Sequence, residues 1–310
     1  MRNAFNDVLI DIARKDESLV LLVGDIGFRV FDDFRDEFPD RFYNVGIAEA
    51  NMIGVAAGLA MTGMKPVVYT IIPFLVMRAF EQIRVDLCIQ DLPAILVGVG
   101  GGLSYDTLGP THHAIEDLAI MRSLPNMQVL TPCDPQEVVM TFREGFSHKG
   151  PTFLRLGKGG EENLLTKNTI KDRVPGKINT IKTGRDILFI CCGPILKETH
   201  KAIDILSSDY DCGLINIHSL KPLDTQSLAE NFRNVNLVVT VEEHSIIGGV
   251  GSAIAEIIAQ SNINVQLLMI GIPDVVTKRI GKRDYLLEKH SMDPKSIAKR
   301  VHSLIVNRRS

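Results

Sequence analysis

Short apolar runs of strand length alternate with segments of helical periodicity along most of the chain. Before residue 160 the apolar runs cover 19–23, 66–71, 94–99, 127–131 and 152–156. Polar residues do not alternate within these runs, so we expect each strand to be buried on both faces, as in a parallel sheet covered by helices. Helical segments lie between the runs, including one expected over 49–61 and one over 76–89. The pattern predicts an α/β domain over residues 1–160.

A second series of the same kind follows a polar stretch. Residues 161–185 are rich in Lys, Asn and Thr and come after Gly157-Lys-Gly-Gly160, which is typical of a surface linker. Apolar runs then resume at 187–192, 213–217, 237–241 and 265–270. We therefore expect two doubly wound α/β domains, 1–160 and 186–310, each with a mainly parallel sheet flanked by helices.

Composition and charge indicate an ordinary globular protein and argue against several other classes. The chain has 310 residues, 45% of them hydrophobic and 23% charged, as in ordinary globular proteins with substantial cores. A formal charge of −3 gives no electrostatic signal for nucleic acid or an anionic membrane as a partner. The N-terminus does not have the pattern of a signal peptide, and the longest apolar stretch, 66–77, is short and contains prolines. We expect a cytoplasmic protein whose five cysteines are buried free thiols.

One carboxylate, Glu49, stands at the start of a stretch with almost no other charge. Residues 47–60 are small or apolar and predict a buried helix, in which Gly54 and Gly58 allow a neighbouring backbone to approach closely. Burial of a carboxylate costs several kcal/mol unless a partner is supplied. Glu49 is therefore a candidate functional residue. The alternative is that it only stabilises the N-terminus of its helix, where carboxylates are favoured.

Two adjacent histidines, His112 and His113, form a second candidate. They follow Gly109-Pro-Thr, a turn that would present them from a loop after the third strand. Open α/β sheets bind ligands at that edge, although a bare histidine pair is more often structural. A further glycine-rich segment, Gly248-Gly-Val-Gly251, opens a helix whose backbone amides would suit an anion. Glycine-assisted packing explains that segment equally well.

Several motifs together resemble the pyrimidine-binding and C-terminal domains of the transketolase family, including deoxyxylulose-phosphate synthase. They are Ile47-Ala-Glu49, Phe74-Leu-x-x-Arg78, Gly109-Pro-Thr-His112, Leu130-Thr-Pro-Cys-Asp134, Lys221-Pro-Leu-Asp224 and Val241-Glu-Glu-His followed by Gly248-Gly-Val-Gly-Ser252. The resemblance covers nearly the whole chain and corresponds to the last two thirds of these enzymes. It implies that residues 1–160 bind the pyrimidine of thiamine diphosphate and that residues 186–310 form the C-terminal domain.

The resemblance also implies roles for individual residues. The family glutamate at the position of Glu49 hydrogen-bonds N1′ of the cofactor's aminopyrimidine, which activates the cofactor. Ile47, Phe74 and Arg78 are implied to complete the cofactor site, and Arg78 is similar to an arginine of the synthase branch. His112 matches the histidine that hydrogen-bonds the substrate near its reacting carbonyl.

The substrate site departs from the family pattern at several positions. His113 replaces a common glutamine, and we expect it to contact the substrate together with His112 and Lys158. Leu108, Gly100 and Lys158 stand where transketolases carry an aspartate, a phosphate-binding histidine and an arginine. A lysine can still bind phosphate as a point charge, without the bidentate geometry of arginine. The sequence therefore indicates a sugar substrate without naming it.

The family domain that binds magnesium and the diphosphate has no counterpart here. Gly24-Asp-Ile-Gly27 lacks the glycine required at Ile26, and we interpret it as a turn at a strand end. We expect no metal ligands on this chain. The resemblance implies that Mg²⁺ is held mainly by an N-terminal transketolase subunit, in an α2β2 heterotetramer with a dimer of this chain at its centre.

The resemblance implies the C-terminal subunit of a two-subunit transketolase that depends on thiamine diphosphate and transfers a two-carbon ketol unit between sugars. It would be active only with its partner. One alternative is the beta subunit of a 2-oxoacid dehydrogenase's decarboxylating component, against which the Gly-Pro-Thr-His112 motif argues. Another is a non-catalytic assembly module of the same fold, against which the presence of Glu49 and His112 argues.

Overall fold

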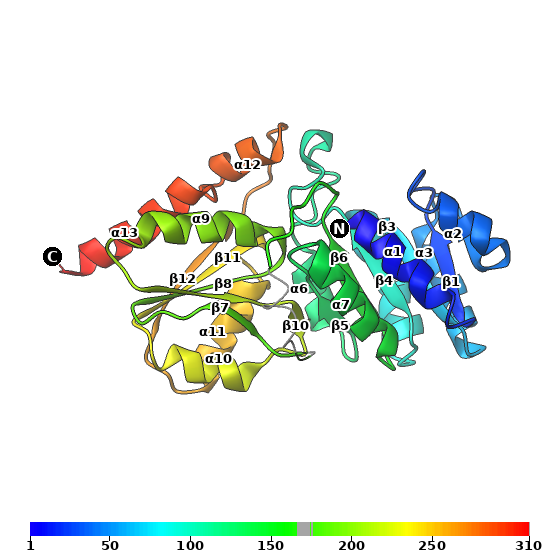
Figure 1. Ribbon diagram of the computed structural model, residues 1–310, viewed down its shortest axis with the longest axis horizontal. Helices are drawn as coiled ribbons and strands as arrows, with labels where there is room; N and C mark the ends of the chain where they lie inside the picture. The colour runs from blue at the N-terminus through cyan, green and yellow to red at the C-terminus, as the bar shows by residue number, and fades with distance from the viewer. Residues whose placement is uncertain (166–173, 175, 310) are drawn as a thin grey trace.

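The chain forms two mainly parallel sheets, each flanked by helices (Figure 1). The computed structural model describes residues 1–165, 174 and 176–309. The predicted fold class is therefore confirmed. Residues 166–173 and 175 of the expected linker lie outside the described residues.

The first sheet has seven strands in the order β10-β5-β6-β4-β3-β1-β2. All neighbours are parallel except β10 and β5, which are antiparallel. Its strands are β1 (Leu19–Val23), β2 (Phe42–Asn44), β3 (Lys65–Ile71), β4 (Ile95–Val99), β5 (Gln128–Leu130), β6 (Thr152–Leu156) and β10 (Ser219–Lys221). The helical elements of this part are α1 (Arg2–Ala13), α2 (Asp32–Glu37), η1 (Pro39–Arg41), α3 (Glu49–Met61), α4 (Ile72–Arg78), α5 (Phe80–Gln82), η2 (Ile83–Cys88), η3 (Asp106–Leu108), α6 (Asp117–Ser123) and α7 (Pro135–Ser147).

The second sheet has five strands in the order β12-β11-β8-β9-β7, and only β7 runs antiparallel to its neighbour. Its strands are β7 (Asn179–Lys182), β8 (Ile187–Cys191), β9 (Cys212–Asn216), β11 (Leu237–Ser245) and β12 (Gln266–Ile272). The helices are η4 (Gly193–Ile195), α9 (Leu196–Leu206), α10 (Thr225–Phe232), α11 (Val250–Gln260), α12 (Arg283–Lys289) and α13 (Pro294–Arg309). In Figure 1, α9 and α13 lie on one face of this sheet and α10 and α11 on the other.

Successive residues of the central strands face opposite cores, as the pleat of a strand requires. In β1, Leu19, Leu21 and Val23 pack in the core on the side of α1 and α7, whereas Val20 and Leu22 pack on the side of α3. The core on the side of α3 also contains residues of the second sheet, such as Ile190. The two domains therefore share one hydrophobic core and pack tightly against each other.

Two edge strands come from segments that we expected in other parts of the fold. β7 lies inside the stretch expected to be a linker, so the second sheet takes residues from before position 186. β10 follows the second-domain strand β9 but pairs with β5 of the first sheet. The helix expected over 76–89 is interrupted and continues as the π-helical turn η2. Within the described residues, no helix is long and apolar enough to cross a membrane.

Candidate functional site

The candidate residues lie in four connections that follow parallel strands of the first sheet. Glu49 comes after β2, Phe74 and Arg78 after β3, His112 after β4 and Lys158 after β6. These strands are parallel, so their carboxyl ends meet at one edge of the sheet. This edge is where open α/β sheets bind ligands.

Glu49 is the first residue of α3, and its side chain is only 1% exposed. Two side chains, Thr70 on β3 and Arg78 at the end of α4, compensate for its burial. Arg78 Nη1 donates a 2.8 Å hydrogen bond to Oε2, and Thr70 Oγ1 donates to Oε1 at 3.4 Å. Glu49 is thus an ion-paired carboxylate whose Oε1 has only a long hydrogen bond among the contacts of the described residues.

The Phe74 ring connects this ion pair with His112. The Arg78 guanidinium lies 4.6 Å from the centroid of the Phe74 ring. The same ring meets His112 edge to face, with 5.1 Å between their centroids, and His112 lies 5.9 Å from Tyr105 on its other side. The structure therefore brings together Glu49, Phe74, Arg78 and His112, which are far apart in the sequence.

His112 and His113 have different environments. His112 is partly exposed, and its Nδ1 lies 2.9 Å from Thr111 Oγ1. Burial, and secondarily the nearby His113, lower the pKa of His112 below its ordinary value. His113 is only 3% exposed, and its Nε2 lies 3.1 Å from the carbonyl oxygen of Asp106 within the same loop.

The remaining predicted site residues, Lys158 and Ile47, lie at the rim of the site, where solvent reaches them. Lys158 Nζ is 3.6 Å from Asp106 Oδ1 and 5.4 Å from the centroid of the Tyr105 ring. Although burial opposes it, hydrogen bonds from Thr107 and the charge of Lys158 hold the pKa of Asp106 below its usual value. Ile47 is 73% exposed next to Glu49, so its apolar side chain is available to a ligand or a partner.

Tyr105 is a site residue that the sequence did not reveal. Gly100 has a φ of +91°, and a Cβ at this position would lie 2.1 Å from the Tyr105 ring. The ring thus packs against the backbone where transketolases are expected to carry a histidine. In the sequence, a glycine at position 100 followed by a tyrosine at position 105 is the feature that could have indicated this contact. The spacing alone does not show that the Tyr105 ring packs against the backbone of Gly100.

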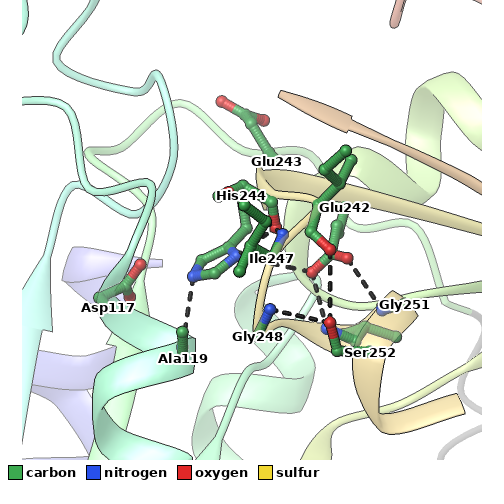
Figure 2. A network of polar contacts seen from close by, with 12 residues as sticks. Asp117, Ala119, Glu242, Glu243, His244, Ile247, Gly248, Gly251 and Ser252 are labelled. Carbon is green, nitrogen blue, oxygen red and sulfur yellow. Dashed lines mark hydrogen bonds and ion pairs between the residues drawn. The ribbon is translucent and has the colours of Figure 1, made fainter. Parts of the chain in front are cut away.

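The glycine-rich segment at the start of α11 binds an internal anion. The Glu242 carboxylate accepts hydrogen bonds from Val250 N at 2.7 Å and Gly251 N at 2.8 Å, as Figure 2 shows for Gly251. A Cβ on Gly249 would lie 2.0 Å from Glu242 Oε2. Both sequence interpretations therefore hold in part, because the amides bind an anion that the chain itself supplies.

No group of three or more His, Cys, Asp or Glu residues in the described part of the chain is arranged to hold a metal ion. Gly24 and Asp25 form a turn after β1, in which the side chains of Asp25 and Asn44 hydrogen-bond each other at 3.1 Å. All five cysteines are buried thiols.

Two family models match the chain. "Transketolase, pyrimidine binding domain" matches residues 1–160, and "Transketolase, C-terminal domain" matches residues 176–297. The chain belongs to the transketolase family. An apulose-4-phosphate transketolase subunit of Actinobacillus succinogenes is 36% identical over 87% of each chain. A 6-deoxy-6-sulfo-D-fructose transketolase subunit of a Clostridium species is 31% identical over 98% of this chain and 94% of its own.

Other members of the transketolase family match with different coverage. A solved structure described as a split gene transketolase, inactive beta4 tetramer, has a TM-score of 0.88 and 33% identity over 97% of both chains. The 1-deoxy-D-xylulose-5-phosphate synthases are also similar, and the chain spans 46% of the one from Syntrophomonas wolfei. The predicted resemblance to both branches is confirmed.

Proposed function

We propose that this chain is the C-terminal subunit of a two-subunit transketolase that depends on thiamine diphosphate. Together with an N-terminal subunit it transfers a two-carbon ketol unit between sugars. The observation that carries the proposal is the buried Glu49 carboxylate, placed at the ligand-binding edge of the first sheet beside Phe74 and near His112. The relatives named as transketolase subunits, which match over nearly their full length, support it.

The residues present fit the aminopyrimidine ring of thiamine diphosphate. Glu49 Oε1 keeps capacity for a further hydrogen bond, as a ring nitrogen requires, and the half-buried Phe74 offers an aromatic face. Ile47 adds exposed apolar surface beside them. When bound, the cofactor supplies a nucleophilic carbon and an electron sink for carbon–carbon bond cleavage.

The protein's own residues orient the reacting groups. Glu49 would share a proton with the ring nitrogen through Oε1, while Arg78 donates a hydrogen bond to its other oxygen, Oε2. The lowered pKa of His112 favours its neutral form, which can donate one hydrogen bond to a substrate oxygen or take up a proton there. Lys158 is positioned by Asp106 at the rim, where its charge suits an anionic substituent of the sugar.

The surface around the site supports an assembly with other subunits. Along α3 the outward side carries Gly54, Val55, Gly58 and Met61, and Met61 is 62% exposed. A Cβ on Gly54 or Gly58 would meet nothing within 4 Å in the described part of the chain. Small and apolar residues on an exposed helix face suit close packing against another subunit. We place the dimer of this chain and its N-terminal partner around this face, in an α2β2 assembly whose partner holds Mg²⁺.

At the position of Gly100, where transketolases are expected to carry a histidine, this chain instead packs the Tyr105 ring against the glycine. Because this ring fills the space beside Gly100, a histidine could not occupy that position without displacing it. The two transketolase-subunit relatives carry the names of apulose 4-phosphate and 6-deoxy-6-sulfo-D-fructose as their sugars. We propose a ketose donor with an anionic terminal group that Lys158 binds.

The product of the reconstituted enzyme tests this function. The chain is expressed with an N-terminal transketolase subunit encoded in the same genome and assayed with both of these donors, glyceraldehyde 3-phosphate, thiamine diphosphate and Mg²⁺. We expect glyceraldehyde 3-phosphate to gain two carbons and become a ketose phosphate, while the donor ketose becomes an aldehyde two carbons shorter. Release of carbon dioxide from 2-oxoacids, without any ketol transfer, would instead assign the chain to a 2-oxoacid dehydrogenase.

A further inference from the structure

The loop that carries His112 is closed at its base by contacts with the second domain. Gly102 and Ala114 hydrogen-bond each other in both directions, at 2.8 and 2.9 Å, where the loop leaves and re-enters the sheet edge. The next amide, Leu103 N, donates a 2.7 Å hydrogen bond to Oε1 of Glu243. Glu243 lies on β11 of the second domain and is only 4% exposed. A buried carboxylate from one domain thus holds the first residues of a loop from the other.

The backbone of Glu243 holds the other end of the same loop. Arg155 Nη2 donates to the carbonyl oxygens of Ala114 at 2.9 Å and of Glu243 at 3.1 Å. A bidentate ion pair with Asp117, at 2.7 and 3.1 Å, fixes the orientation of the guanidinium. Both ends of the loop are therefore tied to one residue of the second domain.

Arg283 neutralises the carboxylate that performs this function. Its Nη2 lies 2.6 Å from Glu243 Oε2, and its Nε lies within 3.2 Å of both carboxylate oxygens. In Figure 2 the Glu243 side chain points away from Glu242 and His244, as expected for adjacent residues on a strand. Gly102 has a φ of +66°, and a Cβ there would lie 2.6 Å from Glu243 Cγ. The close approach therefore depends on a glycine at the base of the loop.

The loop can transmit this constraint to its histidine because it is internally bonded. Ser104 Oγ donates to Gly101 O at 2.6 Å, and His113 Nε2 lies 3.1 Å from Asp106 O. Tyr105 packs on Gly100 at one side and on His112 at the other. A displacement of Leu103 would therefore move the surface against which the His112 ring rests.

We propose that Glu243 and Arg283 are positioning residues, by which the C-terminal domain sets the orientation of His112 towards the substrate. This inference rests on the proposed function. It gives the second domain a part in the reaction that is separate from contacts between subunits. Neither residue touches the substrate, and both act through the backbone of the loop.

Hydrogen exchange and steady-state kinetics test the inference together. The variants are Glu243→Gln, Arg283→Gln and the conservative Arg283→Lys. The matched control is Glu256→Gln, which breaks the interdomain ion pair of Glu256 with Arg122 without touching the loop. Exchange over 100–114 is measured in the purified chain, and kcat and KM are measured in the reconstituted enzyme.

We expect exchange over 100–114 to rise roughly tenfold in Glu243→Gln and Arg283→Gln, with little change elsewhere. The kcat should fall roughly 10- to 100-fold with KM nearly unchanged, as for a displaced catalytic group. Arg283→Lys should recover part of both effects, and Glu256→Gln should show neither.

The inference is overturned if exchange in the loop stays at the wild-type rate, rises equally throughout the second domain, or rises without loss of kcat. Should Glu243→Gln fail to fold, Arg283→Lys and Arg283→Gln decide by the same criteria. If the wild-type pair transfers no ketol unit, the proposed function fails, and the exchange experiment alone decides whether Glu243 holds the loop.

Discussion

Arg78 reaches the carboxylate of Glu49 from the solvent side of the site. The two atoms Nη1 and Oε2 are 2.8 Å apart, yet the Glu49 side chain is 1% exposed and the Arg78 side chain 47% exposed. A buried carboxylate is thus neutralised by a cation that remains half in water. This arrangement compensates for the burial of Glu49 and leaves its other oxygen available to a ligand.

The strength of this ion pair can be measured by a double-mutant cycle. Arg78→Met should lower the free energy of unfolding by about 1–3 kcal/mol, because among the described residues it leaves the buried carboxylate with Thr70 as its remaining partner. The loss should be smaller in the Glu49→Gln background, with a coupling energy of about 1–2 kcal/mol in urea denaturation. Additive losses would show that Arg78 does not stabilise Glu49.

The protonation of His112 gives a prediction for pH dependence. Burial and the neighbouring His113 lower its pKa, so its NMR titration midpoint should lie below 6.5. The folded chain then disfavours the charged form, and His112 becomes protonated only as the pH falls below this midpoint. Ketol transfer should decline over the same range, since the protonated ring can no longer accept a proton.

The variant His113→Gln separates the two causes. It removes the neighbouring imidazole but leaves the burial of His112, so the midpoint should rise and still remain below 6.5. A midpoint above 6.5 in the wild-type chain would contradict the environment described for His112.

Gly102 provides a test of the interdomain contact through stability. Gly102→Ala should destabilise the chain both by its φ of +66° and by the clash with Glu243. Gly63→Ala is the matched control, because Gly63 has a φ of +90° but open space around its Cβ. We expect a loss of about 1–2 kcal/mol for Gly63→Ala from the backbone alone. Gly102→Ala should lose about 1–3 kcal/mol more by overpacking, and equal losses in thermal or urea unfolding would exclude the close contact.

Most of the fold was predictable because the central strands are buried on both faces. The residues of β1, β4 and β8 are all buried, and their uninterrupted apolar runs follow directly from that environment. The edge strands β2 and β10 are both short, β2 is partly exposed and β10 contains polar residues, so they leave no such pattern. The pairing of β10 with the first sheet depends on how the two domains pack, which no local pattern encodes.

Candidate site residues could be identified from the sequence where their charge or local structure differed from that of the surrounding residues. Glu49 is an isolated charge in an apolar stretch, and His112 follows a turn at a strand end. The partners of such residues are set by tertiary structure. Arg78 is 29 positions from Glu49, and Leu103 is 140 positions from Glu243. The glycines before α11 showed that an anion could bind there, but not that Glu242 would be that anion.

We expect Glu49 to act in ketol transfer only when an N-terminal subunit is present. A matched control for Glu49→Gln is Glu37→Gln, which changes an exposed carboxylate paired with Arg14.

The most direct measurement is the rate of ketol transfer by the purified chain alone, by the reconstituted pair, and by the pair carrying Glu49→Gln or Glu37→Gln. We predict no transfer by the chain alone, transfer by the pair, and a loss of about 100- to 10,000-fold in Glu49→Gln. Glu37→Gln should keep the wild-type rate. Substantial transfer by the chain alone would show that no N-terminal subunit is needed, and an unchanged rate in Glu49→Gln would show that Glu49 takes no part in catalysis.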